Sequence, residues 1–148
     1  MDVTADLDAP HPPARVFRWV EDLERYPSWL DIVPRVVDAP GGDAWLVDLR
    51  ARLGPFARSK RLRMVRTRHE PDHAVRFERE ERDGRSHSPW VLDATVEPHD
   101  GGSRLTMHLH YGGGLLGPVV ERLLRDEIER SRPRLLRLLD EGDGSPSD

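Results

Sequence analysis

The segment RVFRWVEDLERYPSWL, residues 15–30, decides how the rest of the chain is interpreted. It places two Trp, one Phe and one Tyr within sixteen positions of an otherwise polar, arginine-rich chain. Four of its apolar residues follow the i, i+3, i+4, i+7 spacing of an amphipathic helix. They are Val16, Trp19, Val20 and Leu23. Pro27 disfavours helical geometry at Tyr26, so we expect the helix to end there and a second short helical piece to cover residues 28–33.

The residues on either side of this segment follow the period of β-strands. Residues 3–9 alternate apolar and polar side chains before a run of prolines ends the pattern. From Trp45 onward the alternation returns in several stretches separated by short turns, which predicts an antiparallel meander with one face toward water. Within residues 58–69 the apolar side chains switch faces after Met64, and a β-bulge would explain the switch.

The last part of the chain predicts one long helix. After three glycines at 112–114, residues 118–139 carry an apolar stripe at helical spacing. The stripe consists of Val120, Leu124, Ile128, Leu135 and Leu138. Pro133 should bend the helix, because proline removes one backbone hydrogen bond and crowds the preceding turn. We expect the polar tail, residues 141–148, to be disordered.

A curved antiparallel sheet can wrap around such a helix, and two short helices can close one edge. Four stretches also carry a family resemblance: Ala9-Pro10, Val16-Phe17, VEDLERYPSWLDIVPRV at 20–36, and HYGGGLLGPVVERLL at 110–124. The chain resembles the START/SRPBCC superfamily, and within it the bacterial polyketide cyclase/dehydrase and coenzyme-Q-binding-like branch. The resemblance implies an α+β helix-grip fold, in which a curved antiparallel sheet of about seven strands wraps around a long C-terminal helix. Two short helices follow the first strand, and residues 1–140 form a single domain.

The resemblance also implies an internal cavity between the sheet and the long helix. We expect a volume of roughly 300–1,000 Å³, as is usual for ligand pockets. We predict that the ligand is bound by residues on the inward face of each predicted strand and helix. They are Trp29, Leu49, Met64, Phe77, Trp90, Leu92, Met107, Leu109, Tyr111, Leu116, Val120 and Leu124.

The composition excludes several classes of protein. The 148 residues carry a formal net charge of −4, which gives no general attraction to nucleic acid, and no aromatic RNA-binding motif is present. Cysteine is absent, and the His residues do not form a metal-binding motif, so we expect neither a metal nor a cofactor. No apolar run is long enough for an integral membrane segment. The acidic N-terminus lacks the features of a secretory signal, which favours a cytoplasmic protein. The oligomeric state cannot be inferred.

Three functions remain open. The first is binding of a hydrophobic small molecule, such as a lipid, a quinone or a polyketide-like compound, in the cavity. The second is an aromatase/cyclase-type enzyme that folds and dehydrates a polyketide chain, which would need polar groups inside the cavity. The third is an interaction module that uses residues 50–68, where eight basic residues occur without an acidic one. The same eight residues also fit a solvated outer face, paired with the acidic residues near position 80.

Four residues are candidates for catalysis if the protein is an enzyme. Arg66 and Arg68 share the inward phase of their predicted strand, and Arg79 shares the inward phase of the next one. A permanently charged arginine in an apolar cavity would need an acidic partner or a ligand oxygen, and it could donate hydrogen bonds to an enolate. Tyr111 is the best candidate for proton transfer, although an ordinary tyrosine titrates near pH ~10. The phase of the strands places no His or carboxylate inside.

Overall fold

The structure is a computed structural model, and it describes residues 1–53, 55–112 and 117–141. The predicted disordered tail lies outside these ranges from residue 142 onward, and so do Gly113 and Gly114 of the glycine triplet.

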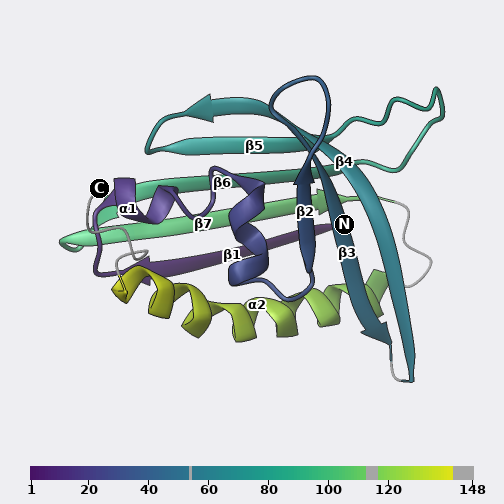
Figure 1. Cartoon of the computed structure of the whole chain (residues 1–148). Coiled ribbons are helices and arrows are strands. Elements are labelled where there is room, and N and C mark those ends of the chain that lie inside the picture. The colour runs from purple at the N-terminus through teal and green to yellow at the C-terminus, as the bar shows by residue number, and fades with distance from the viewer. Residues whose placement is uncertain (54, 113–116, 142–148) are drawn as a thin grey trace.

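One curved sheet of seven strands forms most of the protein (Figure 1). The strands are β1 (Asp2–Ala9), β2 (Arg35–Asp38), β3 (Ala44–Leu53), β4 (Phe56–Glu70), β5 (Ala74–Arg79), β6 (Trp90–His99) and β7 (Gly102–Tyr111). Their order in the sheet is β1-β7-β6-β5-β4-β3-β2, and each neighbouring pair is antiparallel. The strands from β2 to β7 therefore form a meander, while β1 pairs with β7 at the far end of the sequence.

The long helix α2 (Gly117–Asp140) runs along one face of this sheet, as Figure 1 shows. The predicted helix-grip fold, with its antiparallel sheet, its C-terminal helix and two short helices after the first strand, is confirmed. The helix continues without interruption through Pro133. The bend at Pro133 stays a prediction.

The two short helices differ in extent from the prediction. The first, α1 (Pro13–Phe17), is only five residues long. The second is the 3₁₀ helix η1 (Leu23–Ser28), which contains Pro27 in its interior. The prediction of a helix over residues 28–33 is wrong, because the Asp22 carboxylate accepts a hydrogen bond from the Glu24 N–H, at 2.9 Å, and starts the helix earlier.

Strand β4 contains the predicted bulge. Arg66 lies opposite Phe77 and Arg68 lies opposite Arg76, so Thr67 is an extra residue on β4. Before the bulge, Leu62 and Met64 point into the core and are almost completely buried. After it, the alternation of β4 is shifted by one residue, and this shift moves Arg68 to the outer face beside Arg76.

Candidate ligand cavity

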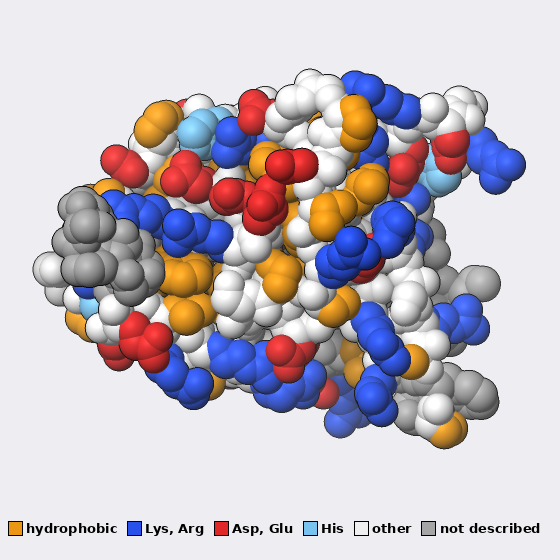
Figure 2. Space-filling model, in the orientation of Figure 1, with side chains coloured by type: hydrophobic (Ala, Val, Ile, Leu, Met, Phe, Trp, Pro, Cys, Tyr) orange, Lys and Arg blue, Asp and Glu red, His pale blue; other side chains and the backbone are white. Residues whose placement is uncertain are grey.

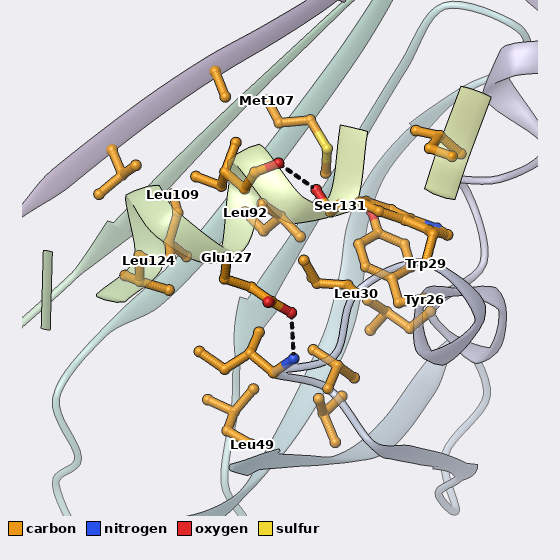
Figure 3. Close-up of a pocket in the computed structure, with 18 of the residues that line it drawn as sticks. Tyr26, Trp29, Leu30, Leu49, Leu92, Met107, Leu109, Leu124, Glu127 and Ser131 are labelled. Carbon is orange, nitrogen blue, oxygen red and sulfur yellow. Dashed lines mark hydrogen bonds between the residues drawn. The ribbon is translucent and has the colours of Figure 1, made fainter. Parts of the chain in front are cut away.

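A cavity of about 180 Å³ lies between the inner face of the sheet, helix α2 and the turn that follows η1 (Figure 3). Its volume is smaller than the sequence led us to expect. Two polar contacts join α2 to this turn. The Arg134 guanidinium lies 2.7 Å from the Asp31 carboxylate, and the Glu127 carboxylate accepts a hydrogen bond from the Ile32 N–H.

Eight of the twelve residues predicted to bind a ligand border the cavity. They are Trp29, Leu49, Met64, Trp90, Leu92, Met107, Leu109 and Leu124. The alternation of the strands brings them together, because cross-strand pairs such as Leu92–Leu109 and Ala94–Met107 place their side chains on one face. Residue Leu116 and the side chain of Val120 lie outside the described part of the chain.

Phe77 and Tyr111 belong to the core but do not border the cavity. Phe77 is completely buried, and its ring meets Trp45 and Tyr26 edge-on at centroid distances of 5.6 and 6.3 Å. These rings fill the space beneath β5. The Tyr111 ring stacks on Trp90, and its hydroxyl donates to the Met1 Sδ at 2.8 Å.

The sequence interpretation missed the segment from η1 into the following turn. Leu23, Tyr26, Leu30, Ile32 and Val33 all border the cavity. The error about the helix over residues 28–33 hid this set, because a helix would have turned only part of it inward.

Three polar residues of α2, Glu127, Ser131 and Arg132, also border the cavity, although the phase of the strands predicted no carboxylate inside. Glu127 is 4% exposed, and its Oε2 accepts from the Ile32 N–H at 2.7 Å. Its Oε1 accepts from the Arg130 guanidinium at 3.1 Å. The Ser131 hydroxyl donates to the Ile128 carbonyl at 2.7 Å, and the Ile32 and Ser131 hydrogen bonds appear as dashed lines in Figure 3. The helical spacing held a signal for Glu127 and Ser131, since they follow Leu124 by three and seven positions on the buried stripe.

Three further polar groups lie on aromatic side chains at the wall, and two of them form hydrogen bonds. The Tyr26 hydroxyl donates to the Val20 carbonyl at 2.9 Å, and burial, followed by the charge of Asp22, raises the pKa of this hydroxyl far above its ordinary value. The Trp29 Nε1 donates to the Trp19 carbonyl at 3.2 Å. The Trp90 Nε1 is buried and has no hydrogen-bond partner among the described residues.

None of the four candidate catalytic residues borders the cavity. Arg66 donates to the Glu21 carbonyl and to the Asp43 carboxylate, both at 2.9 Å, at the end of the sheet. Arg68 pairs with Glu70 on the outer face, because the bulge at Thr67 reverses its direction.

Arg79 is half-buried, and its guanidinium lies 2.7 Å from the Glu81 carboxylate. Burial, followed by the charge of Glu121, raises the pKa of the Tyr111 hydroxyl, which makes this group a poorer proton donor. In the described part of the chain, therefore, none of these candidates lies at the cavity wall.

Residues 1–139 match the family described as "Polyketide cyclase / dehydrase and lipid transport". The chain belongs to this family. No curated protein matches it at a significant level. In the described part of the chain, no helix has both the length and the apolar character needed to cross a membrane. Family membership and the apolar cavity together support a role in binding a hydrophobic ligand.

Solved structures with the same fold come from several bacteria. A START superfamily protein from Mycobacterium smegmatis is similar with a TM-score of 0.71 and 15% identity, over 95% of this chain and 97% of that one. A protein from Chromobacterium violaceum has a TM-score of 0.68 and 18% identity, over 94% and 96%. A protein from Thermus thermophilus has a TM-score of 0.63 and 22% identity, over 100% of both chains. Sequence identities this low establish only that these proteins share the fold.

Proposed function

We propose that this protein is a carrier that binds a small hydrophobic molecule in the cavity and releases it unchanged. The observation that carries this proposal is the character of the wall. The strands and the turn after η1 supply apolar side chains to it, apart from Asp6. The polar side chains that α2 adds, Glu127, Ser131 and Arg132, are engaged by the protein itself.

The size of the cavity narrows the choice of ligand. An apolar protein cavity of about 150 Å³ binds a benzene molecule, and the cavity here is of similar volume at about 180 Å³. The volume favours a single ring, such as the head of a quinone, or a short acyl segment over a folded polyketide chain.

A cyclase remains the second candidate because of Glu127. The Glu127 carboxylate is buried at the cavity wall, and a buried carboxylate can act as a general base. Against this role, each of its oxygens already accepts a hydrogen bond from the protein. We therefore rank the carrier above the enzyme.

Calorimetric titration with toluene, menadione and oleate tests the proposal, because these ligands present one ring, two rings and a long chain. We expect saturable binding of toluene with a negative heat-capacity change, which marks burial of apolar surface, and weaker binding of the two larger ligands. Leu92→Trp should weaken toluene binding at least tenfold by filling the cavity. Val91→Trp, which lies on the outer face of the same strand, is the matched control. Absence of saturable binding, or an equal loss in both variants, would refute the proposal.

A direct assay separates the carrier from the enzyme. The parent protein and Glu127→Gln would be incubated with a poly-ketone substrate and the products followed by mass spectrometry. A carrier leaves the substrate unchanged. Conversion by the parent protein that collapses in Glu127→Gln, while toluene affinity is retained, would establish the enzyme in its place.

A further inference from the structure

The outer half of the β3–β4 hairpin, residues 49–61, forms a projecting arm that carries an unusual charge. We call it the basic arm. It reaches past the N-terminal end of α2 in Figure 1. It contains five basic residues and no acidic one, and these are Arg50, Arg52, Arg58, Lys60 and Arg61. Subtracting these five charges from the chain's formal −4 leaves −9 on all other residues. The protein is therefore strongly polarised, with a basic arm on an acidic body.

Four of the five cations on the basic arm are exposed and form no ion pair with another described residue. Arg61 is the exception, since its guanidinium lies 2.7 Å from the Asp48 carboxylate. Farther along β4, by contrast, Arg66 and Arg68 are paired with Asp43 and Glu70. Arg66 and Arg68 therefore have acidic partners, but not the acidic residues near position 80 that the sequence suggested. Figure 2 shows blue side chains gathered at the lower right, where the hairpin lies.

The cations occupy both faces of the arm. Arg50 and Arg52 share one face, because side chains two apart on a strand point the same way. Lys60 and Arg58 lie opposite Leu49 and Ala51 and so share the other face. The strands end at the pair Leu53–Phe56, and exposed Pro55 lies in the turn between them. A sequence that is apolar at its tip and flanked by cations on both strands is typical of segments that enter the interface of an anionic membrane.

The arm also adjoins the cavity. Leu49 borders both the cavity and a shallow groove whose wall includes Arg50 and Lys60. The Lys60 Nζ lies 6.0 Å from the centre of the Trp90 ring, which is itself part of the cavity wall. A partner surface that binds the arm would therefore lie next to the cavity.

We propose that the basic arm docks the protein onto an anionic lipid membrane. The cations attract the lipid headgroups, and the acidic body is repelled, so the protein meets the surface arm first. An RNA partner fits less well, because the sequence contains no aromatic RNA-binding motif. The added claim that docking exchanges ligand with the bilayer rests on the proposed function. The docking itself does not.

Sedimentation with vesicles, in the absence of any cavity ligand, tests the docking. The protein should bind vesicles of phosphatidylcholine and phosphatidylserine (at a ratio of about 70:30) and not vesicles of phosphatidylcholine alone. Binding should weaken as salt rises, because surface charges are screened over ~8 Å at physiological ionic strength. Each basic residue near such a surface strengthens binding by about fivefold, so Arg52→Gln/Arg58→Gln should weaken it by about 25-fold.

The matched control is Arg85→Gln/Arg137→Gln, which removes the same charge from exposed positions off the arm. It should bind anionic vesicles as the parent protein does, and all variants should keep the parent's affinity for toluene. Equal binding to both kinds of vesicle, or an equal loss in the control, would overturn the proposal. Arm-dependent binding of single-stranded RNA or of an acidic protein, without vesicle binding, would also overturn it. If the protein binds anionic vesicles but does not bind toluene, only the proposed function is refuted.

Discussion

The hydrogen bond from the Ile32 N–H to the Glu127 carboxylate is the contact whose removal we expect to be most informative. It joins the middle of α2 to the turn after η1, across an edge of the cavity. The perturbation is a pair of substitutions. Glu127→Gln keeps an oxygen that can accept the bond, whereas Glu127→Ala leaves the Ile32 N–H without an acceptor.

The structure allows the two effects to be estimated separately. A hydrogen bond to a charged group contributes about 1.5–3 kcal/mol, and an unsatisfied buried donor costs about 1–3 kcal/mol. The Arg130 side chain is 59% exposed, so its ion pair with Glu127 contributes no more than about 1 kcal/mol. We therefore expect Glu127→Gln to lower the free energy of unfolding by about 1 kcal/mol and Glu127→Ala by about 3 kcal/mol.

Urea unfolding at pH ~7 measures both values. Glu129→Gln is the control, because the Glu129 side chain is 70% exposed and pairs with Arg132 on the helix surface. It should change the free energy of unfolding by less than about 1 kcal/mol. Equal losses of unfolding free energy in Glu127→Gln and Glu127→Ala, or a loss in Glu127→Ala no larger than in the control, would refute this role of the hydrogen bond. Glu127→Ala should also enlarge the cavity and increase its affinity for menadione relative to toluene.

Two further predictions concern stability. Leu62 is 2% exposed and borders the cavity, so Leu62→Ala should lower the free energy of unfolding by about 3 kcal/mol in urea, and a loss under about 1 kcal/mol would mean that the wall collapses around the gap. The hydrogen bond from Arg104 holds the pKa of the Asp8 carboxyl below its ordinary value, so the folded state binds this proton less readily than the unfolded state does. The pair therefore stabilises the fold above pH ~4, and its contribution is lost as the pH falls through the lowered pKa. Urea unfolding between about pH 5 and pH 3 should be less steeply pH-dependent in Asp8→Asn, and an unchanged slope would contradict this.

The sequence predicted the architecture well because its signals are local and repeated. The period of two along the strands and the stripe on α2 each recur over several turns or pleats of the chain. A bulge within residues 58–69 was also predicted, although it lies at Thr67 and not at the switch of apolar side chains between Met64 and Val65. Its consequence for Arg68 was not, because the position of the extra residue depends on how β4 pairs with β5, and Thr67 carries no local mark of it.

The cavity wall was predicted less completely because part of it lies in irregular backbone. Leu30 and Ile32 follow a 3₁₀ helix, and no simple period says which way such residues point. Glu127 was missed for a different reason. Its spacing places it on the buried stripe, but its charge argues for the surface, and only the tertiary contact with the Ile32 N–H resolves the conflict.

The pairing of β1 with β7 has a consequence for how the protein acquires its cavity. Strand β1 contributes Val3, Ala5 and Leu7 to the cavity wall. Among the described strands it pairs with β7, with Asp2 opposite His110 and Ala9 opposite Ser103. The strands from β2 to β6 each have a sequence neighbour to pair with as synthesis proceeds, but β1 must wait for β7. Loop closure over so many residues is slow, and the unpaired edges are open to other chains until it is complete. The cavity should therefore be one of the last parts of the molecule to form, and a nascent chain would have no enclosed site for a ligand until its final strand and the helix that follows it had been made.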